Sequence, residues 1–425
     1  MRILIVTWAW PPVGRVGALR PMGMAREWVK AGHVVHVVTG PGDRGGEYSP
    51  DIEELARTTG AVVHRAPAPG VARPTHRREP SDATVLDLEA RPPVGRLRQI
   101  LSQWKNFPDH QRSWIGPALV VTRGIHGSTP IDVVWTTSPP ESVHFVGRAL
   151  ARQGVPWIAD FRDPWSDYFL ARWDPLSRWL VDRIARRVLR PAHAVTAASE
   201  GIARLIGRAT HVQPIRMYNG FDDQVLASEP FAPRSLGYFG RVDPRDQHPE
   251  RLWPALRAVR AGNAPWTVAF FLSPGGGGGA GLRVPDDLRP SVTVRPTIPH
   301  GAALDAMRRY AALLVLGVES AHGEDIVPAK VFEYAGSGRP ALIVAPTHFE
   351  IRHLVESTRI GVGAWQTDEL TRALGTLETF RVDETDRRSM SRTAAAAAAL
   401  DLFTGVVAPT QTAPAQGIHH PRRSK

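Results

Sequence analysis

Residues 324 to 344, EDIVPAKVFEYAGSGRPALIV, combine side chains that can hold a phosphorylated ligand. Pro328 suits the first position of a helix, where backbone N–H groups near Ala329 and Lys330 have no intrahelical partner. Lys330 and Glu333 stand three residues apart, so they share one helix face. A lysine beside such amides can bind a diphosphate, and a carboxylate one turn deeper can accept hydrogen bonds from both hydroxyls of a ribose. The plainer alternative is a surface Lys–Glu pair worth a few tenths of a kcal/mol.

A second set of candidates lies where apolar runs end. Arg241 follows GYFG, at the strand edge where open α/β sheets bind ligands. Gly14 and Gly17 follow the first apolar run and would let the backbone approach a ligand, while Arg15 and Arg20 would meet its negative charge. The alternative is a tight turn with solvated arginines. The G-x-G-x-x-G fingerprint is absent and no acidic residue closes the second strand, which argues against a dinucleotide-dependent dehydrogenase.

The run PWIADF ends in three charged residues, Asp160, Arg162 and Asp163. An aspartate at a strand end could contact a bound hydroxyl. The structural alternative pairs Asp160 with Arg162 and lets Asp163 cap the next segment. We favour the functional interpretation for Asp160 and leave Asp163 open. His144 is a further candidate because it also follows a strand end, although a single histidine is more often structural.

These residues need strands that end at common edges, and the sequence predicts such strands. Apolar, β-branched runs alternate with helical patterns in two series, which is typical of doubly wound parallel sheets. The strands expected in the first series are 2–8, 33–40, 131–137, 155–161, 192–199 and a short one within 214–222. Those of the second are 235–243, 266–272, 291–297, 311–318 and 340–344. The helices expected are 20–32, 140–154, 173–192, 200–207, one from 328, and 385–403.

Composition then divides the chain. Residues 65–113 are too rich in Pro and Arg to pack, so we predict a mobile insertion there. The segments predicted are a first α/β domain over 1–225, a linker over 226–234, a second α/β domain over 235–385, a C-terminal helix over 386–407 and a disordered tail over 408–425.

Bulk numbers exclude several classes of protein. The chain has 425 residues, 43% of them hydrophobic, and no apolar run reaches the twenty or so residues that cross a bilayer. A signal peptide is not expected either. Zero cysteines exclude a disulfide framework and thiolate metal sites. The net charge of +11 suits an anionic small molecule or membrane surface better than a nucleic acid, because no clustered nucleic-acid motif is present.

One predicted helix has two interpretations. In 173–192, Leu176, Leu180, Ile184 and Val188 recur every four residues, and arginines lie largely elsewhere. Such a helix could rest on an anionic membrane, or its apolar stripe could pack on the sheet. We favour packing, and we expect GRLRQILSQW, residues 95–104, to be the better membrane or acceptor contact.

Five motifs occur in a fixed order: PWIADFRDPW, VTAASEGIARL, MYNGFD, GYFGR and PAKVFEYAGSGRPALIV. Together they resemble a family 4 retaining glycosyltransferase of the GT-B fold, over residues 1–345. The resemblance implies two Rossmann-like domains facing across a cleft, with the C-terminal helix crossing back to the first. It also implies that Glu333 holds the ribose of the donor, and that Arg241 and Lys330 bind its diphosphate.

The sequence departs from the family pattern in three places. Family members usually carry two glutamates separated by seven residues, but the first position here is Asp325, expected near the transferred sugar. A lysine usually follows the strand-end arginine, and this chain offers Arg245. Many relatives place a histidine after the strand that here ends in Asp160.

We therefore predict a hexosyltransferase-like enzyme of glycoconjugate biosynthesis that transfers a sugar from a nucleotide diphosphate sugar to an acceptor hydroxyl, with retention of configuration. Asp160, Asp325 and His144 are the catalytic candidates, Gly14 and Gly17 join the diphosphate site, and Arg20, Arg162 and Asp163 are expected to bind the acceptor. No D-x-D triplet is present, so no metal and no other cofactor is expected.

The acceptor stays open among glycans, lipid-linked molecules and small molecules. The location predicted is cytoplasmic, with peripheral contact at the inner membrane face. Two alternatives remain, a sugar-nucleotide epimerase of the same architecture and a non-enzymatic protein that binds polyanions.

Overall fold

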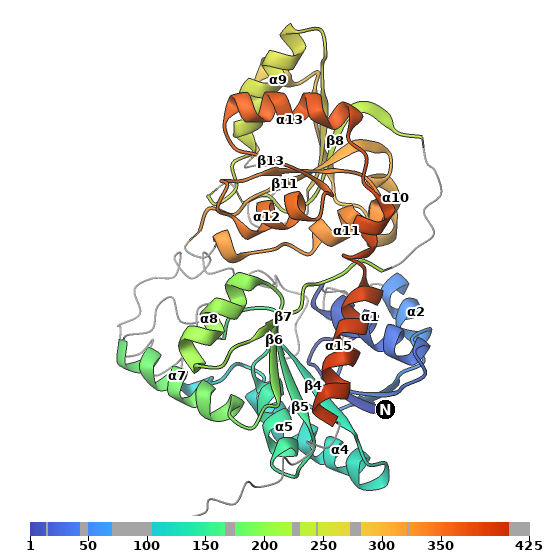
Figure 1. The fold of residues 1–425 in the computed structure, drawn as a ribbon, viewed down its shortest axis with the longest axis vertical. Coiled ribbons are helices and arrows are strands. Elements are labelled where there is room, and N and C mark those ends of the chain that lie inside the picture. The colour runs from blue at the N-terminus through green and yellow to red at the C-terminus, as the bar shows by residue number, and fades with distance from the viewer. Residues whose placement is uncertain are drawn as a thin grey trace, which may run out of the picture.

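Two lobes make up the molecule, each built on a parallel sheet covered by helices (Figure 1). The computed structural model describes residues 1–13, 16–42, 50–69, 104–165, 175–222, 230–243, 245–272, 282–320 and 323–407. Gly14, Arg15 and most of the predicted insertion, including nearly all of 95–104, lie outside the described residues. Each sheet carries one hydrophobic cluster on each face, as a doubly wound sheet must.

The first sheet has the strand order β3-β2-β1-β4-β5-β6-β7. Its strands are β1 (Arg2–Val6), β2 (Val34–Thr39), β3 (Val62–Arg65), β4 (Val133–Ser138), β5 (Trp157–Phe161), β6 (Ala194–Ala197) and β7 (Ile215–Arg216). The helices around it are α1 (Val16–Lys30), α2 (Pro50–Arg57), α4 (Ile115–Ser128), α5 (Ser142–Ala151), α7 (Pro175–Leu189) and α8 (Glu200–Thr210).

The second sheet repeats the pattern with the order β10-β9-β8-β11-β12-β13. Its strands are β8 (Ala232–Gly240), β9 (Thr267–Leu272), β10 (Val292–Pro296), β11 (Tyr310–Leu316), β12 (Ala341–Val344) and β13 (Gly361–Ala364). Its helices are α9 (Leu252–Ala261), α10 (His300–Met307), α11 (Lys330–Ser337), α12 (Glu350–Ser357), α13 (Thr367–Thr379) and α14 (Glu384–Arg388), and a single turn, η4 (Gly323–Asp325), precedes α11.

In each parallel sheet the order of successive strands reverses at one point, between β1 and β4 in the first and between β8 and β11 in the second. Helices on the two sides of such a point leave in opposite directions, which opens a crevice beyond the carboxyl ends of the strands. Arg241 follows β8 directly, so it stands at this point of the second sheet.

The two predicted series of strands are therefore confirmed, with differences at element ends. The helix α1 begins at Val16, so Gly17 lies in its first turn and not in a loop. The strand β8 begins at Ala232, inside the predicted linker, and the predicted helix 385–403 is divided into α14 and α15 (Arg392–Val407). Strands β3 and β13 and helices α2, α4, α12 and α13 were not predicted individually.

The expected return of the C-terminal helix is confirmed, because α15 runs beside α1 on the first lobe (Figure 1). Ala396, Ala399 and Phe403 are buried against the core of the first sheet, and small alanines let the helix approach closely. The indole Nε1 of Trp28 donates to the carbonyl of Ala396 at 3.1 Å, and the Phe403 ring lies 5.0 Å from that of Trp28.

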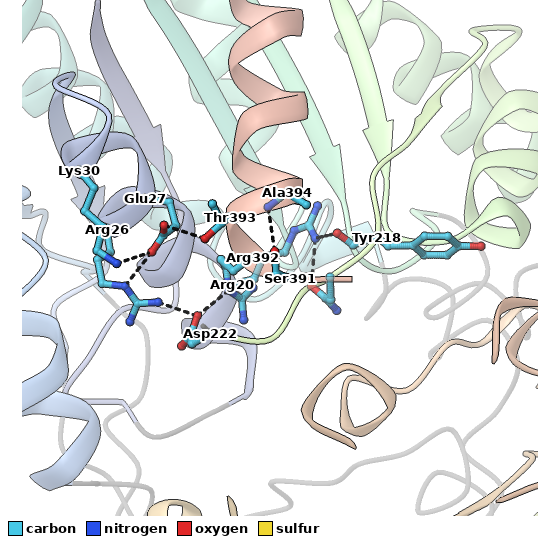
Figure 2. Close-up of polar contacts among 11 residues, drawn as sticks. Arg20, Arg26, Glu27, Lys30, Tyr218, Asp222, Ser391, Arg392, Thr393 and Ala394 are labelled. Carbon is cyan, nitrogen blue, oxygen red and sulfur yellow. Dashed lines mark hydrogen bonds and ion pairs between the residues drawn. The ribbon is translucent and has the colours of Figure 1, made fainter. Parts of the chain in front are cut away.

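Ion pairs fasten the start of α15, as Figure 2 shows. Arg392 Nε donates to Asp222 Oδ1 at 2.9 Å, and Arg26 of α1 pairs with the same oxygen at 2.9 Å. Thr393 Oγ1 donates to Glu27 Oε2 at 3.0 Å. The chain thus crosses between the lobes at two places that lie side by side.

The packing predicted for the helix at 173–192 is confirmed for the second half of its stripe and wrong for the first. Val188 is buried and Ile184 packs on the core, whereas Leu176 and Leu180 are exposed. In the first half of α7 the buried residues are Ser177 and Val181, so Leu176 and Leu180 form a separate outward surface. Among the described residues, no helix is long and apolar enough to cross a membrane.

The contact of α15 with the first lobe predicts a large effect of truncating its buried phenylalanine. Phe403→Ala should lower the free energy of unfolding by about 3 to 5 kcal/mol, because the ring is fully buried against Trp28. Asp401→Ala, at an exposed position of the same helix, should change it by less than about 0.5 kcal/mol. Urea unfolding followed by tryptophan fluorescence measures both, and equal losses would contradict this account of the helix.

Candidate functional site

The tip of β8 and the start of α11 meet in the second lobe. Gly240 ends the strand with φ 128°, a conformation that favours glycine, and a Cβ there would lie 3.0 Å from Lys330 Nζ. The Lys330 ammonium also lies 4.1 Å from the centre of the Tyr238 ring, over its face. Because Arg241 is the next residue after Gly240, the structure brings the two predicted diphosphate-binding cations to one strand tip.

Two aspartates balance part of this charge. Asp243 pairs with Arg241 at 3.0 Å and with Arg245 at 3.2 Å. Burial works to raise the pKa of Asp243, but hydrogen bonds from Arg245 and Arg241 hold it below its ordinary value. Burial and the charge of Asp243 raise the pKa of the nearby Asp246. The tip therefore carries Arg241, Arg245 and Lys330 against two aspartates.

Glu333 lies one turn further along α11, as its spacing predicts. Its side chain is 24% exposed, and its Oε1 lies 3.9 Å from His300 Nδ1 at the start of α10. Burial raises the pKa of Glu333, while His300 and Lys330 act in the opposite direction. Glu333 and Arg20 line one cavity of about 240 Å³ between the lobes, together with Asn219, Asp222, His300 and Arg392.

The sequence analysis did not select His300. The signal was available, because His300 follows the strand that ends at Pro296 as Arg241 follows β8. Parallel strands end at one edge, so the same rule would have placed both residues there.

Asp160 is not the cleft residue that the sequence suggested. It is fully buried at the end of β5 and accepts hydrogen bonds from Arg20 Nε and Nη2 at 3.2 and 2.9 Å. Thr137 and Thr196 donate to the same carboxylate at 2.7 and 2.8 Å. With both oxygens occupied, Asp160 serves as the partner of Arg20, and not of Arg162 as the structural alternative had it.

Arg20 is committed to internal partners too. Beyond Asp160, its guanidinium donates to the carbonyls of Met217 and Tyr218 at 2.9 Å each and to Asn219 Oδ1 at 3.0 Å. Arg20 thus borders the cavity, but its N–H groups are all used in hydrogen bonds within the protein. This differs from its predicted role in binding the acceptor molecule.

Arg162 likewise contacts the protein's own backbone. It donates to the carbonyls of Ser138, Gly17 and Pro139 at 2.7, 2.6 and 3.1 Å. A Cβ on Gly17 would lie 2.8 Å from Arg162 Nη1, so glycine is needed there for close approach. The described contacts of Gly17 are with Arg162, and none of them joins it to Arg241 or Lys330.

His144 lies inside the first lobe and not at the cleft. Its Nδ1 is 2.8 Å from Thr136 Oγ1, and its ring lies 4.2 Å from the centre of Phe161. Burial lowers the pKa of His144 to about 3, so the ring is neutral near pH 7. The Thr136 hydroxyl accepts from Trp157 Nε1, which directs its own proton to His144 Nδ1. This is the environment of a structural histidine.

Two buried carboxyls near the carboxyl ends of β4 and β5, those of Asp109 and Glu141, were missed. Asp109 accepts from the Ser142 amide and hydroxyl at 2.7 and 2.6 Å, and Glu141 Oε2 has no hydrogen-bond partner among the described residues. Burial raises the pKa of Glu141 well above its ordinary value, and Asp109 and Asp163 add to this rise. Burial also raises the pKa of Asp163. Asp109 escaped notice because it lies in the segment predicted as mobile.

The described contacts of the Asp325 side chain are with the first lobe. Asp325 is buried, and its Oδ1 pairs with Arg204 Nη2 of α8 at 2.5 Å. The predicted catalytic aspartates are thus both paired with arginines, and neither is placed beside Lys330 or Glu333 by a described contact.

The buried pair of Arg20 and Asp160 predicts a stability effect. Asp160→Asn should lower the free energy of unfolding by about 3 to 5 kcal/mol, because Arg20 would remain buried without a full counter-charge. Asp132→Asn is the matched control, since Asp132 pairs with Arg2 at 3.1 Å at the surface, and should cost less than about 1 kcal/mol. Urea unfolding compares the two variants. Similar losses would show that burial is not the source of the effect.

Residues 18–218 match the family model described as a glycosyl transferase 4-like domain. None of the curated proteins compared with the sequence matches it. Among solved structures, sucrose-phosphate synthase from Thermosynechococcus elongatus is similar over 95% of this chain and 98% of its own, with 15% identity and a TM-score of 0.56. The N-terminal domain of trehalose-6-phosphate phosphatase from Candida albicans is similar over 95% of this chain and 97% of its own, with 11% identity and a TM-score of 0.63.

A glycosyltransferase from Rickettsia africae is similar over 96% of this chain and 99% of its own, with 10% identity and a TM-score of 0.57. At these identities the likeness shows the fold alone. The fold is GT-B, with two parallel-sheet α/β domains of seven and six strands among the described residues. The match over 18–218 adds the class of function, because it supports a glycosyltransferase.

Proposed function

We propose that the protein transfers a sugar from a nucleotide diphosphate sugar to an acceptor hydroxyl, with retention of configuration and without a divalent cation. The observation that carries the proposal is the meeting of Lys330 with the tip of β8, beside Arg241 and one turn before Glu333. Two cations at a strand tip and a carboxylate one turn deeper fit a diphosphate joined to a ribose.

In the proposed reaction, the bond between the anomeric carbon and the leaving phosphate oxygen breaks as the acceptor oxygen attacks from the same face. The proton of the acceptor hydroxyl passes to the leaving phosphate. Arg241 and Lys330 stabilise the charge that develops on the diphosphate, which is electrostatic catalysis by groups already in position. No protein nucleophile is required, and the pairing of Asp160 with Arg20 and of Asp325 with Arg204 fits that view.

The acceptor is proposed to bind the first lobe, at the carboxyl edge of β4 and β5. Asp163 and the buried carboxyl of Glu141 lie at that edge, and both have raised pKa values because they are buried. A carboxyl can accept a hydrogen bond from a hydroxyl whether or not it is protonated. The chemical class of the acceptor stays open.

Donor binding provides the test. A panel of nucleotide diphosphate sugars should include one that raises the melting temperature, because a ligand at 100 times its Kd stabilises the folded state by about 2.7 kcal/mol. Glu333→Ala should abolish that rise, since it removes the proposed ribose contact. Glu356→Ala, a change of a more exposed glutamate on α12, should leave it intact.

Two outcomes would contradict the donor site. One is a Glu333→Ala variant that responds to the donor like the parent. The other is binding that ignores every sugar nucleotide but falls steeply with salt, which would favour the polyanion-binding alternative. A donor that binds and is converted to its epimer without an acceptor would favour the epimerase.

We also propose peripheral contact with an anionic membrane, through the outer face of α7. Trp179 is 54% exposed there beside Leu180, and the guanidinium of Arg183 lies 4.8 Å from the centre of the Trp179 ring. Arg186 and Arg187 are exposed on the same helix. An apolar strip bordered by arginines suits a surface of anionic lipid headgroups. With no cysteine in the chain, a cytoplasmic setting at the inner membrane face is the proposed location.

Trp179→Glu should weaken binding to vesicles of phosphatidylglycerol and phosphatidylcholine by about tenfold, because it removes an inserted ring and adds repulsion. Val120→Glu is the matched control, since Val120 is 73% exposed on α4. Co-sedimentation measures both variants. Equal binding by the parent and by Trp179→Glu would show that α7 is not the contact.

A further inference from the structure

A carboxylate from the second lobe caps a helix of the first. Glu350, the first residue of α12, is buried and accepts from the amides of Glu200 and Gly201 at 2.7 and 2.8 Å. These two amides belong to the first turn of α8, where N–H groups have no intrahelical partner and the helix dipole favours a negative charge. Tyr218 of the first lobe donates to Glu350 Oε1 at 2.9 Å. The cap of α8 is therefore complete only when the lobes are together.

Asp325 makes a second contact with the same helix. Ser199, the N-cap residue of α8, accepts from the Ile202 amide and donates through its Oγ to the Asp325 carbonyl at 2.9 Å. The Asp325 carboxylate pairs with Arg204 one turn further along α8. Both the backbone and the side chain of Asp325 are thus held by the first lobe.

The fit between the two lobes is close at Gly201. A Cβ on Gly201 would lie 2.1 Å from the Cβ of Asp325, a separation that atoms do not reach. The φ of Gly201 is not positive, so close approach and not backbone conformation requires glycine here. An alanine at this position would force the lobes apart or push Asp325 aside.

The contact at Asp325 lies close in the chain to α11, the helix that carries Lys330. The turn η4 ends at Asp325, and α11 begins at Lys330, so only residues 326–329 connect them. The first lobe therefore contacts the segment that immediately precedes the helix of Lys330.

We propose that Ser199, Gly201, Arg204 and Tyr218 of the first lobe, with Asp325 and Glu350 of the second, form an interdomain latch that sets the closed arrangement of the enzyme. Arg204 acts in it as a positioning residue that holds Asp325. Glu350 caps the N-terminus of α8. The inference that the latch controls turnover rests on the proposed function. The latch itself does not.

Distance measurements between the lobes test the latch without turnover. The chain has no cysteine, so Arg123→Cys on α4 and Arg372→Cys on α13 introduce exactly one spin-label site in each lobe, both at exposed positions. The parent should give one narrow distance distribution. Glu350→Ala and Gly201→Ala should broaden it or shift it to longer distances. Arg208→Ala, at an exposed position of the same α8, should match the parent.

Kinetics supply the second readout. Glu350→Ala and Arg204→Ala should lower kcat by about tenfold or more, while the donor concentration for half-maximal melting-temperature shift changes by less than about twofold. Glu350→Gln keeps the shape and one acceptor oxygen, so it should recover part of the loss. Arg208→Ala should keep the parent's kcat.

The outcomes separate the two claims. If folded Glu350→Ala and Gly201→Ala both keep the parent's distance distribution and kcat, the latch is wrong even though transfer is real. If the parent binds no sugar nucleotide, the proposed function fails, and the distance distributions alone still decide whether the latch exists.

Discussion

The guanidinium of Arg20 joins the parts of the molecule that meet at the cleft. It is buried on α1, pairs with Asp160 in β5, and holds the backbone of residues 217–219 through two carbonyls and the Asn219 side chain. Burying a cation without hydrogen-bond partners costs free energy, so the folded state favours keeping these bonds. The bonds to Arg20 therefore hold residues 217–219 in place. The same segment carries Tyr218 to Glu350 and Asp222 to Arg392. The contacts of Tyr218 and Asp222 therefore come from a stretch of chain that Arg20 helps to position, next to those made by α8.

The two edges of the cleft differ in charge. The tip of β8 carries more cations than carboxylates, whereas the edge of the first sheet holds carboxyls whose pKa values are raised by burial. Burial disfavours the ionised form of such carboxyls, which lowers their tendency to oppose a nearby anion.

Local patterns were sufficient for most strands of the two sheets, although not for the edge strands β3 and β13, and for the positions of Lys330 and Glu333. A buried parallel strand is a continuous apolar run. Strands such as β1 and β11 can therefore be recognised from a few consecutive residues. Lys330 and Glu333 were predictable for the same reason, because a helix start and a spacing of three are local features. Their roles in donor binding remain a prediction.

Contacts between distant residues could not be read in that way. Asp160 and Arg20 are 140 residues apart, and Arg204 and Asp325 are 121 apart, so no local spacing distinguishes a buried ion pair from a reactive carboxylate. The face of the first half of α7 was also mistaken, because its inward residues include Ser177, which has little weight in an apolar pattern. What the sequence lacks in these cases is the identity of the neighbour.

The return of α15 to the first lobe has a consequence for synthesis on the ribosome. Domains usually fold as they emerge, the N-terminal one first. Here one face of the first sheet, with Trp28 and Trp135, is covered by residues near 396–403, which are translated only after the whole second lobe. The nascent first lobe therefore lacks the part of this core that α15 supplies until residues 396–403 have been translated.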